Sequence, residues 1–235
     1  MPIQAIEPPR LYRQVADQLR RLIDSGEYAT GARLPTEREL AQQFGLSRPT
    51  VREALIALEV EGRVRIRVGS GIYVRALAEQ SPSPTRDNDE GPFELLRARE
   101  FVEGAVAAEA ALHASDEDIR KLEELLDRMR TRTHPSAETI GLDRDFHTGV
   151  AGILRNAVVV RFIGEMFDLR LNPYFERLSS YFENGQSWRA ATEEHKAVLA
   201  AIAAHDPDAA KAAMQNHLRL SQIRFSRNFG ERFEP

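Results

Sequence analysis

Four residues in the C-terminal half of the chain have the side chains and the spacing of a metal site. Asp143 and His147 stand four residues apart in a run of helical periodicity, so both lie on one face of a predicted helix. His195 and His217 each stand eleven residues from Asp206, one before it and one after it. If the chain turns at Asp206 between two antiparallel helices, both histidines lie about 16 Å from that turn, at the same height.

One carboxylate and three imidazoles that converge inside a helical bundle would bind a divalent metal ion. Each buried polar group needs a partner, and one oxygen with three nitrogen ligands suits zinc, nickel, manganese or iron. We expect zinc first, although the spacing does not choose among these metals. A single histidine on an apolar helix face is more often a core residue, so the hypothesis depends on all four side chains meeting. Such an ion would keep positions open for water or for a ligand carboxylate.

Two further residues of this half are candidates for binding a small effector. Arg99 lies on an inward helical stripe and has two alternative roles. It could form an ion pair with Glu103, four residues further on, or it could bind an effector carboxylate with its guanidinium fork. Asn216, beside His217, could bind hydroxyl groups of the effector or serve only in packing.

The charge of the chain divides into two unlike parts. The whole chain of 235 residues carries a net charge of −4, but residues 1–76 hold twelve arginines against nine acidic residues, a net of +3. The remaining residues sum to −7, so the acidic total does not exclude DNA as a partner. The chain has no cysteine, which excludes disulfides, thiol nucleophiles and iron–sulfur clusters. No apolar run approaches the ~18 residues of a membrane span, and we expect a cytoplasmic protein without a membrane partner.

The basic part has the element order of a winged helix-turn-helix. A helical pattern begins at Leu11, Thr36 and Glu39 form a capping box for a second helix, and Ser47 caps a third. Alternating residues at 64–68 and 72–75 then flank a glycine turn, which predicts a β-hairpin. Residues at the start of a recognition helix reach base edges in the major groove. The candidate DNA-contacting residues of this segment are Arg38, Arg48, Pro49, Thr50 and Arg52, with Gly69, Ser70 and Gly71 at the hairpin tip.

From residue 93 onward the pattern is helical throughout and predicts an all-α bundle of six or seven helices. The fold class is therefore mainly α. Residues 77–92 are rich in Ser, Pro, Asp and Asn and read as a linker between a DNA-binding domain at 1–76 and a helical effector-binding and dimerisation domain at 93–235. A mixed α/β effector domain in place of the all-α bundle is an alternative that has little support in the pattern.

Residues 11–75 resemble the DNA-binding domain of GntR-family transcription regulators, notably in LPTERELAQQFGLSRPTVREALIALEVEGRVRIRVGSGIYV. The resemblance implies operator contacts from Arg38, Arg48, Thr50 and Arg52, with the hairpin tip entering the adjacent minor groove. Pro49 stands where the family commonly has Thr or Ser, so one hydrogen-bonding side chain is absent.

Residues 93–225 resemble the FCD ligand-binding domain of FadR-type GntR regulators. The motifs are Asp143-x-x-Phe146-His147, Glu194-His195-Lys196 and Met214-Gln215-Asn216-His217-Leu218, and the family's metal ligands fall on the same four residues. The stretches at 88–100 and 193–202 resemble hexuronate-utilisation repressors. This likeness implies a sugar-acid effector, a hexuronate or an aldonate.

The sequence therefore predicts a homodimeric transcription regulator, a repressor, that binds a palindromic operator in double-stranded DNA under the control of a carboxylate metabolite. The alternative is a metal-dependent enzyme that acts on a small sugar acid, with the helix-turn-helix as a tether. We do not expect an enzyme, because no further residue stands as a general base beside the four candidate ligands.

Overall fold

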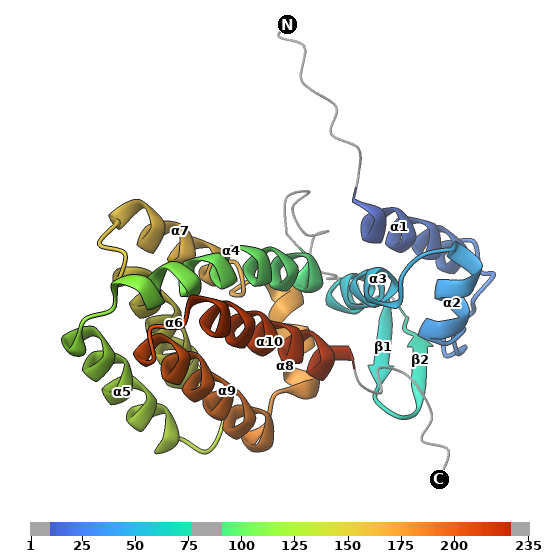
Figure 1. Cartoon of the computed structure of the whole chain (residues 1–235). Helices are drawn as coiled ribbons and strands as arrows, with labels where there is room; N and C mark the ends of the chain where they lie inside the picture. Colours follow the sequence, from blue (N-terminus) through green and yellow to red (C-terminus); the bar gives the residue numbers. More distant parts are fainter. Residues whose placement is uncertain (1–9, 77–90, 227–235) are drawn as a thin grey trace, which may run out of the picture. The chain divides into compact units, whose positions relative to one another are not determined.

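The structure, a computed structural model, describes residues 10–76 and 91–226 (Figure 1). The described residues divide into two compact units, one that contains residues 10–76 and one of residues Glu94–Phe225. Most of the predicted linker, residues 77–90, lies outside the described residues.

The first unit is built from three helices and a hairpin: α1 (Leu11–Asp24), α2 (Glu37–Phe44), α3 (Arg48–Val60), β1 (Val64–Arg67) and β2 (Gly71–Val74). α1 and α2 both pack against α3. The two strands are antiparallel, with Val64 opposite Val74 and Arg67 opposite Gly71. This arrangement confirms the predicted winged helix-turn-helix.

Local chemistry explains the turn between α2 and α3. The Thr36 side chain accepts a hydrogen bond from the Glu39 amide, and the Glu39 carboxylate accepts one from the Thr36 amide, which completes the predicted capping box. α2 ends at Gly45, whose left-handed backbone (φ +66°) suits glycine. Ser47 accepts a hydrogen bond from the Thr50 amide at the start of α3. The two helices are thus held apart by a short, well-defined turn.

The second unit holds seven helices among its described residues, and residues 94–225 contain no strand. The helices are α4 (Pro92–His113), α5 (Asp116–Arg130), α6 (Ala137–Gly152), α7 (Ala157–Asp168), α8 (Pro173–Phe182), α9 (Gly185–Ala203) and α10 (Pro207–Ser226). The helical bundle is therefore confirmed, and a mixed α/β effector domain is excluded. No helix in the described part of the chain is long and apolar enough to cross a membrane.

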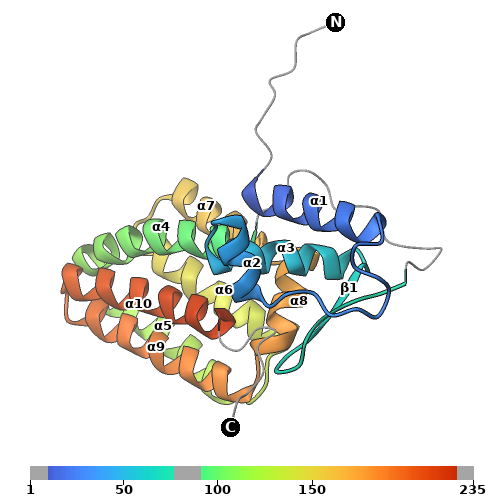
Figure 2. The same ribbon diagram turned by 90° about the vertical axis from the view of Figure 1, so that its right-hand side faces the viewer.

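The helices that carry the candidate metal ligands meet inside this bundle. α9 and α10 form an antiparallel pair, and α10 lies between α4 and α9 in both views (Figure 1 and Figure 2). Asp206 caps α10 by accepting a hydrogen bond from the Ala209 amide, and Asn184 caps α9. The predicted hairpin about Asp206 is therefore present, and it brings His195 and His217 to the same level of the bundle.

Candidate metal centre and ligand pocket

The four candidate ligands converge in the interior of the bundle. Each offers one donor atom, and these atoms all lie within 4.8 Å of one another. The Nε2 atom of His195 lies 3.3 Å from Nε2 of His147 and 3.3 Å from Oδ1 of Asp143. The rings of His195 and His217 lie 4.3 Å apart, and all four side chains are buried. Three imidazoles and one carboxylate thus face a common point, as a metal site of this ligand set requires.

Two carboxylates behind the cluster orient two of its three histidines. Glu103 on α4 contacts Nδ1 of His147, and Glu194 on α9 lies 2.9 Å from Nδ1 of His217. Because Nδ1 of each ring is taken by a carboxylate, Nε2 is left to point into the cluster. Burial raises the pKa of Glu103, but the charges of Arg99 and His147 outweigh it and lower that pKa to about 2. Burial lowers the pKa of His147, but the Glu103 charge brings it above the ordinary value.

The pKa values of the other three side chains are shifted in the directions that favour metal binding. Burial raises the pKa of Asp143, but its hydrogen bond with His147 and the charge of Arg170 hold that pKa well below the ordinary value. Burial and a neighbouring histidine hold the pKa values of His195 and His217 well below their ordinary value. An ionised carboxylate and neutral imidazoles are the forms that bind a divalent cation. The donor set therefore fits such an ion.

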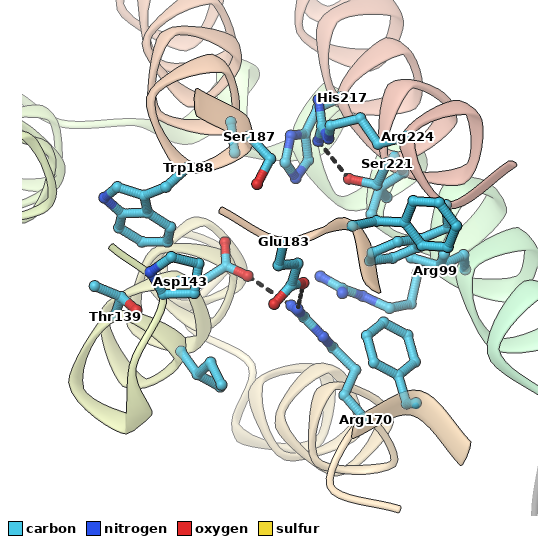
Figure 3. A pocket seen from close by; sticks show the side chains of 18 residues that line it. Arg99, Thr139, Asp143, Arg170, Glu183, Ser187, Trp188, His217, Ser221 and Arg224 are labelled. Carbon is cyan, nitrogen blue, oxygen red and sulfur yellow. Dashed lines mark hydrogen bonds and ion pairs between the residues drawn. The ribbon is translucent and has the colours of Figure 1, made fainter. Parts of the chain in front are cut away.

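A pocket opens beside the cluster, and Asp143 and His217 line it (Figure 3). Three of the lining side chains are arginines, namely Arg99, Arg170 and Arg224. Hydroxyl groups come from Thr139, Ser187 and Ser221, and aromatic rings from Phe175, Phe182, Trp188 and Phe225. Such a lining offers positive charge, hydroxyl partners and ring faces to one small ligand.

The two predicted effector-binding residues differ in their placement. Arg99 lines the pocket, as binding of an effector carboxylate would require. It also forms the ion pair with Glu103, with Nε 2.5 Å from Oε1. Asn216 is exposed and is not among the residues that line the pocket. Adjacent residues on a helix point about 100° apart, so an inward His217 turns Asn216 away from the pocket.

The predicted DNA-contacting residues surround the start of α3. Arg38 is exposed on α2, and the Arg48 side chain is 43% exposed while its Nε atom bonds Oε1 of Glu37 at 2.7 Å. Arg52 is only 1% exposed, and its Nη2 atom lies 2.5 Å from Oε2 of Glu37. Arg52 is therefore buried in this structure, and its DNA contact stays a prediction. The reason for the burial is the buried Glu37 carboxylate on the preceding helix, which holds Arg52 inside.

The remaining members of that set are small or lie at the hairpin tip. Pro49 and Thr50 are half-buried in the first turn of α3, and the Thr50 hydroxyl bonds that of Ser47 at 2.8 Å. Gly69 and Gly71 have positive φ values of +72° and +137°, which only glycine adopts freely. Ser70 at the tip bonds the Tyr73 hydroxyl. The tip is thus a tight turn of small residues, preceded by the exposed side chain of Val68.

Comparison with known proteins decides the family. Residues 11–74 match the model described as "Bacterial regulatory proteins, gntR family", and residues 94–220 match the FCD domain. The chain belongs to the GntR family. A Uxu operon regulator of Haemophilus influenzae is 35% identical to it over 217 residues, which are 92% of this chain and 82% of that relative. An Exu regulon transcriptional regulator of Escherichia coli is 35% identical over 239 residues, which are 99% of this chain and 91% of that relative.

This GntR protein is a DNA-binding transcription regulator of the FadR type, and its relatives are regulators rather than enzymes. Among solved structures, E. coli McbR/YncC is 22% identical, with a TM-score of 0.51 over 92% of this chain and 97% of that one. That likeness supports the shared fold alone.

Some pocket residues of this GntR regulator carried no signal in the sequence. Arg170 and Glu183 fall in the connections on either side of α8, where no periodicity shows which way a side chain points. Arg224 stands near the end of α10 and bonds Glu194 through both terminal nitrogens, at 2.6 and 3.1 Å. For Arg224, the position of its partner Glu194 directly before the candidate ligand His195 is the signal that the sequence offers.

Proposed function

We propose that this regulator binds a sugar-acid carboxylate at a divalent metal ion held by Asp143, His147, His195 and His217, and that the ligand controls operator binding. The observation that supports this most strongly is the buried cluster of one carboxylate and three imidazoles beside a pocket with three arginines. Four buried donor groups that face one point favour a cation, and the arginines that line the pocket can exchange a carboxylate partner of the chain for a ligand carboxylate. Zinc is the first candidate, with nickel, manganese or iron as alternatives.

The pocket residues suit the rest of a sugar acid as well. A bound metal ion would supply a Lewis acid that holds a carboxylate oxygen. The hydroxyl groups of Thr139, Ser187 and Ser221 offer hydrogen bonds to the hydroxyl groups of a sugar, and Trp188 offers a ring face to its C–H groups. The names of the Uxu and Exu relatives favour a hexuronate, and an aldonate has the same chemistry.

We propose a homodimer that binds a palindromic operator and acts as a repressor in the cytoplasm. Large apolar side chains are exposed on α4 and on α7, and such surfaces mark protein interfaces. They are Phe101, Leu112, Val158 and Phe162. Two-fold symmetry would place two recognition helices in successive major grooves.

In each copy, the proposed DNA contacts come from α2, the start of α3 and the hairpin tip. Arg38 and Arg48 are exposed enough to reach phosphates or bases, and the Gly69, Ser70 and Gly71 tip is narrow enough for a minor groove. Arg52 would add a base contact only after leaving Glu37.

The sole tryptophan of the chain, Trp188, lines the pocket and reports directly on its occupancy. We expect zinc-loaded protein to change its tryptophan fluorescence on titration with D-glucuronate or D-galacturonate, and to bind its operator with altered affinity in a gel shift. The same titration after chelation and dialysis is the control. Equal responses with and without metal would refute the metal-dependent binding, and no response to any sugar acid would refute the effector class.

A further inference from the structure

We infer that Arg170 binds the ligand carboxylate. The Glu183 carboxylate, which pairs with Arg170 in this structure, is displaced by the ligand. The inference rests on the proposed function and specifies which side chains of the pocket change partner. In Figure 3, the guanidinium of Arg170 points toward the carboxylates of Asp143 and Glu183, and all three residues line the pocket. Its Nη1 atom bonds Oδ2 of Asp143 at 2.6 Å, and its Nη2 atom bonds Oε1 of Glu183 at 3.3 Å.

The three pocket arginines differ in how firmly their carboxylate partners are held. The partner of Arg99 is Glu103, which also orients His147, and the partner of Arg224 is Glu194, which also orients His217. A ligand that displaced either glutamate would remove a carboxylate from a histidine of the metal cluster.

Glu183 has no such second task among its interactions in the described structure. Its side chain is 21% exposed, whereas that of Glu103 is 2% exposed. It also lies outside a helix, in the connection between α8 and α9. Glu183 can therefore turn toward water when a ligand arrives, while a displaced Glu103 would remain a buried, unpaired charge, which is far more costly.

The guanidinium of Arg170 is already oriented for an incoming carboxylate. It lies over the rings of Phe167 and Phe175, at 4.8 and 4.9 Å from the ring centres. Its Nε atom is buried and has no hydrogen-bond partner in the described structure. Nε and Nη2 form one edge of the guanidinium, so a bidentate carboxylate would satisfy both. Glu183 reaches only Nη2, and a ligand carboxylate would gain the bond to Nε that Glu183 leaves unmade.

Replacement of Glu183 by a ligand carboxylate on Arg170 would also affect the candidate metal centre and the start of α9. Arg170 bonds the oxygen of Asp143 that points away from His195, so it fixes the orientation of the other oxygen toward the imidazoles. Glu183 directly precedes Asn184, the N-cap of α9, whose first turn carries Ser187 and Trp188 of the pocket. Displacement of Glu183 therefore acts on the helix that carries His195.

The test measures carboxylate binding to zinc-loaded wild type, Glu183→Gln, Arg170→Lys and the control Glu176→Gln, which removes an exposed charge from α8. The probes are D-glucuronate and acetate, titrated by calorimetry, with zinc content determined for each protein. We expect Glu183→Gln to bind both probes at least about tenfold more tightly, because the ligand no longer has to displace a charged partner from Arg170. Arg170→Lys keeps the charge but loses the fork, so we expect at least about tenfold weaker binding at unchanged zinc content. Glu176→Gln should match the wild type.

The outcomes separate this inference from the proposed effector. If Glu183→Gln binds the probes no more tightly than the wild type, the displacement is wrong. If the wild type binds acetate but not D-glucuronate, D-glucuronate is not the effector, and the acetate series still decides the role of Glu183. If neither probe binds to the wild type or to Glu183→Gln, Arg170 is not a carboxylate receptor, while the zinc content still reports on the metal centre.

Discussion

Replacement of His195 by alanine would remove one donor from the centre of the cluster. Its Nε2 atom is 3.3 Å from both Asp143 and His147, and its ring is fully buried, so no other side chain can take its place without moving the bundle. We expect zinc to stabilise the wild type and to have no comparable effect on His195→Ala. His113→Ala is the matched control, because His113 is exposed at the end of α4, away from the cluster, and pairs with Glu109.

The size of the effect follows from mass action. A metal ion at a thousand times its dissociation constant stabilises the folded state by about 4 kcal/mol. In a chain of this size each kcal/mol raises the melting temperature by about 2–4 °C, which gives a zinc-dependent rise of roughly 8–16 °C. With three donors left, we expect at least about a hundredfold loss of affinity, which leaves at most about 1.4 kcal/mol of stabilisation, so most of that rise should disappear in His195→Ala. His113→Ala should keep all of it.

The assay is a thermal melt of each protein after chelation and dialysis, with and without added zinc, together with metal content by atomic emission. Comparing each protein with itself cancels the cost of the cavity that alanine leaves, which lowers the melting temperature of the variant in both conditions. Full zinc stoichiometry and an undiminished rise in His195→Ala would refute the four-ligand centre.

Three further predictions concern DNA binding, helix capping and assembly. Arg48→Ala should weaken operator binding by about 1–3 kcal/mol and relax sequence preference, whereas equal losses on cognate and scrambled duplexes in a gel shift would indicate a phosphate contact only. Thr36→Ala should lower the free energy of unfolding by about 1 kcal/mol in urea, because it removes the α2 cap, and exposed Thr30→Ala should not. Phe162→Glu on the exposed face of α7 should convert dimers to monomers, measured by light scattering. An unchanged mass would contradict the proposed interface. The control Arg120→Glu on α5 should leave the mass unchanged.

The sequence predicted those parts of the molecule that depend on local chemistry and on helical period. The α2 cap needs only Thr36 and Glu39 three residues apart, and the structure forms it. The meeting of His195 and His217 follows from their equal distance to the Asp206 turn, because two antiparallel helices with the same rise keep such residues level.

The parts that sequence reasoning missed depend on partners far away in the chain. Arg52 has the type and position of a base contact, but its burial depends on Glu37, fifteen residues earlier on another helix. Arg170 and Glu183 lie in connections, so their meeting depends on how α7 and α8 pack. Helical periodicity and capping motifs each describe one element at a time. Neither shows which charged side chains will meet in the interior of the folded protein.

The charges around the candidate centre explain why metal and ligand should bind together. Seven charged side chains surround it, four carboxylates and three guanidinium groups: Asp143, Glu103, Glu183, Glu194, Arg99, Arg170 and Arg224. With neutral imidazoles, as metal binding requires, this group has a net charge of −1. A divalent cation changes it to +1, and a ligand with one carboxylate brings it to zero. Since charge buried without compensation is costly, the metal ion should raise the affinity for a monocarboxylate, and by linkage the monocarboxylate should raise the affinity for the metal ion by the same factor.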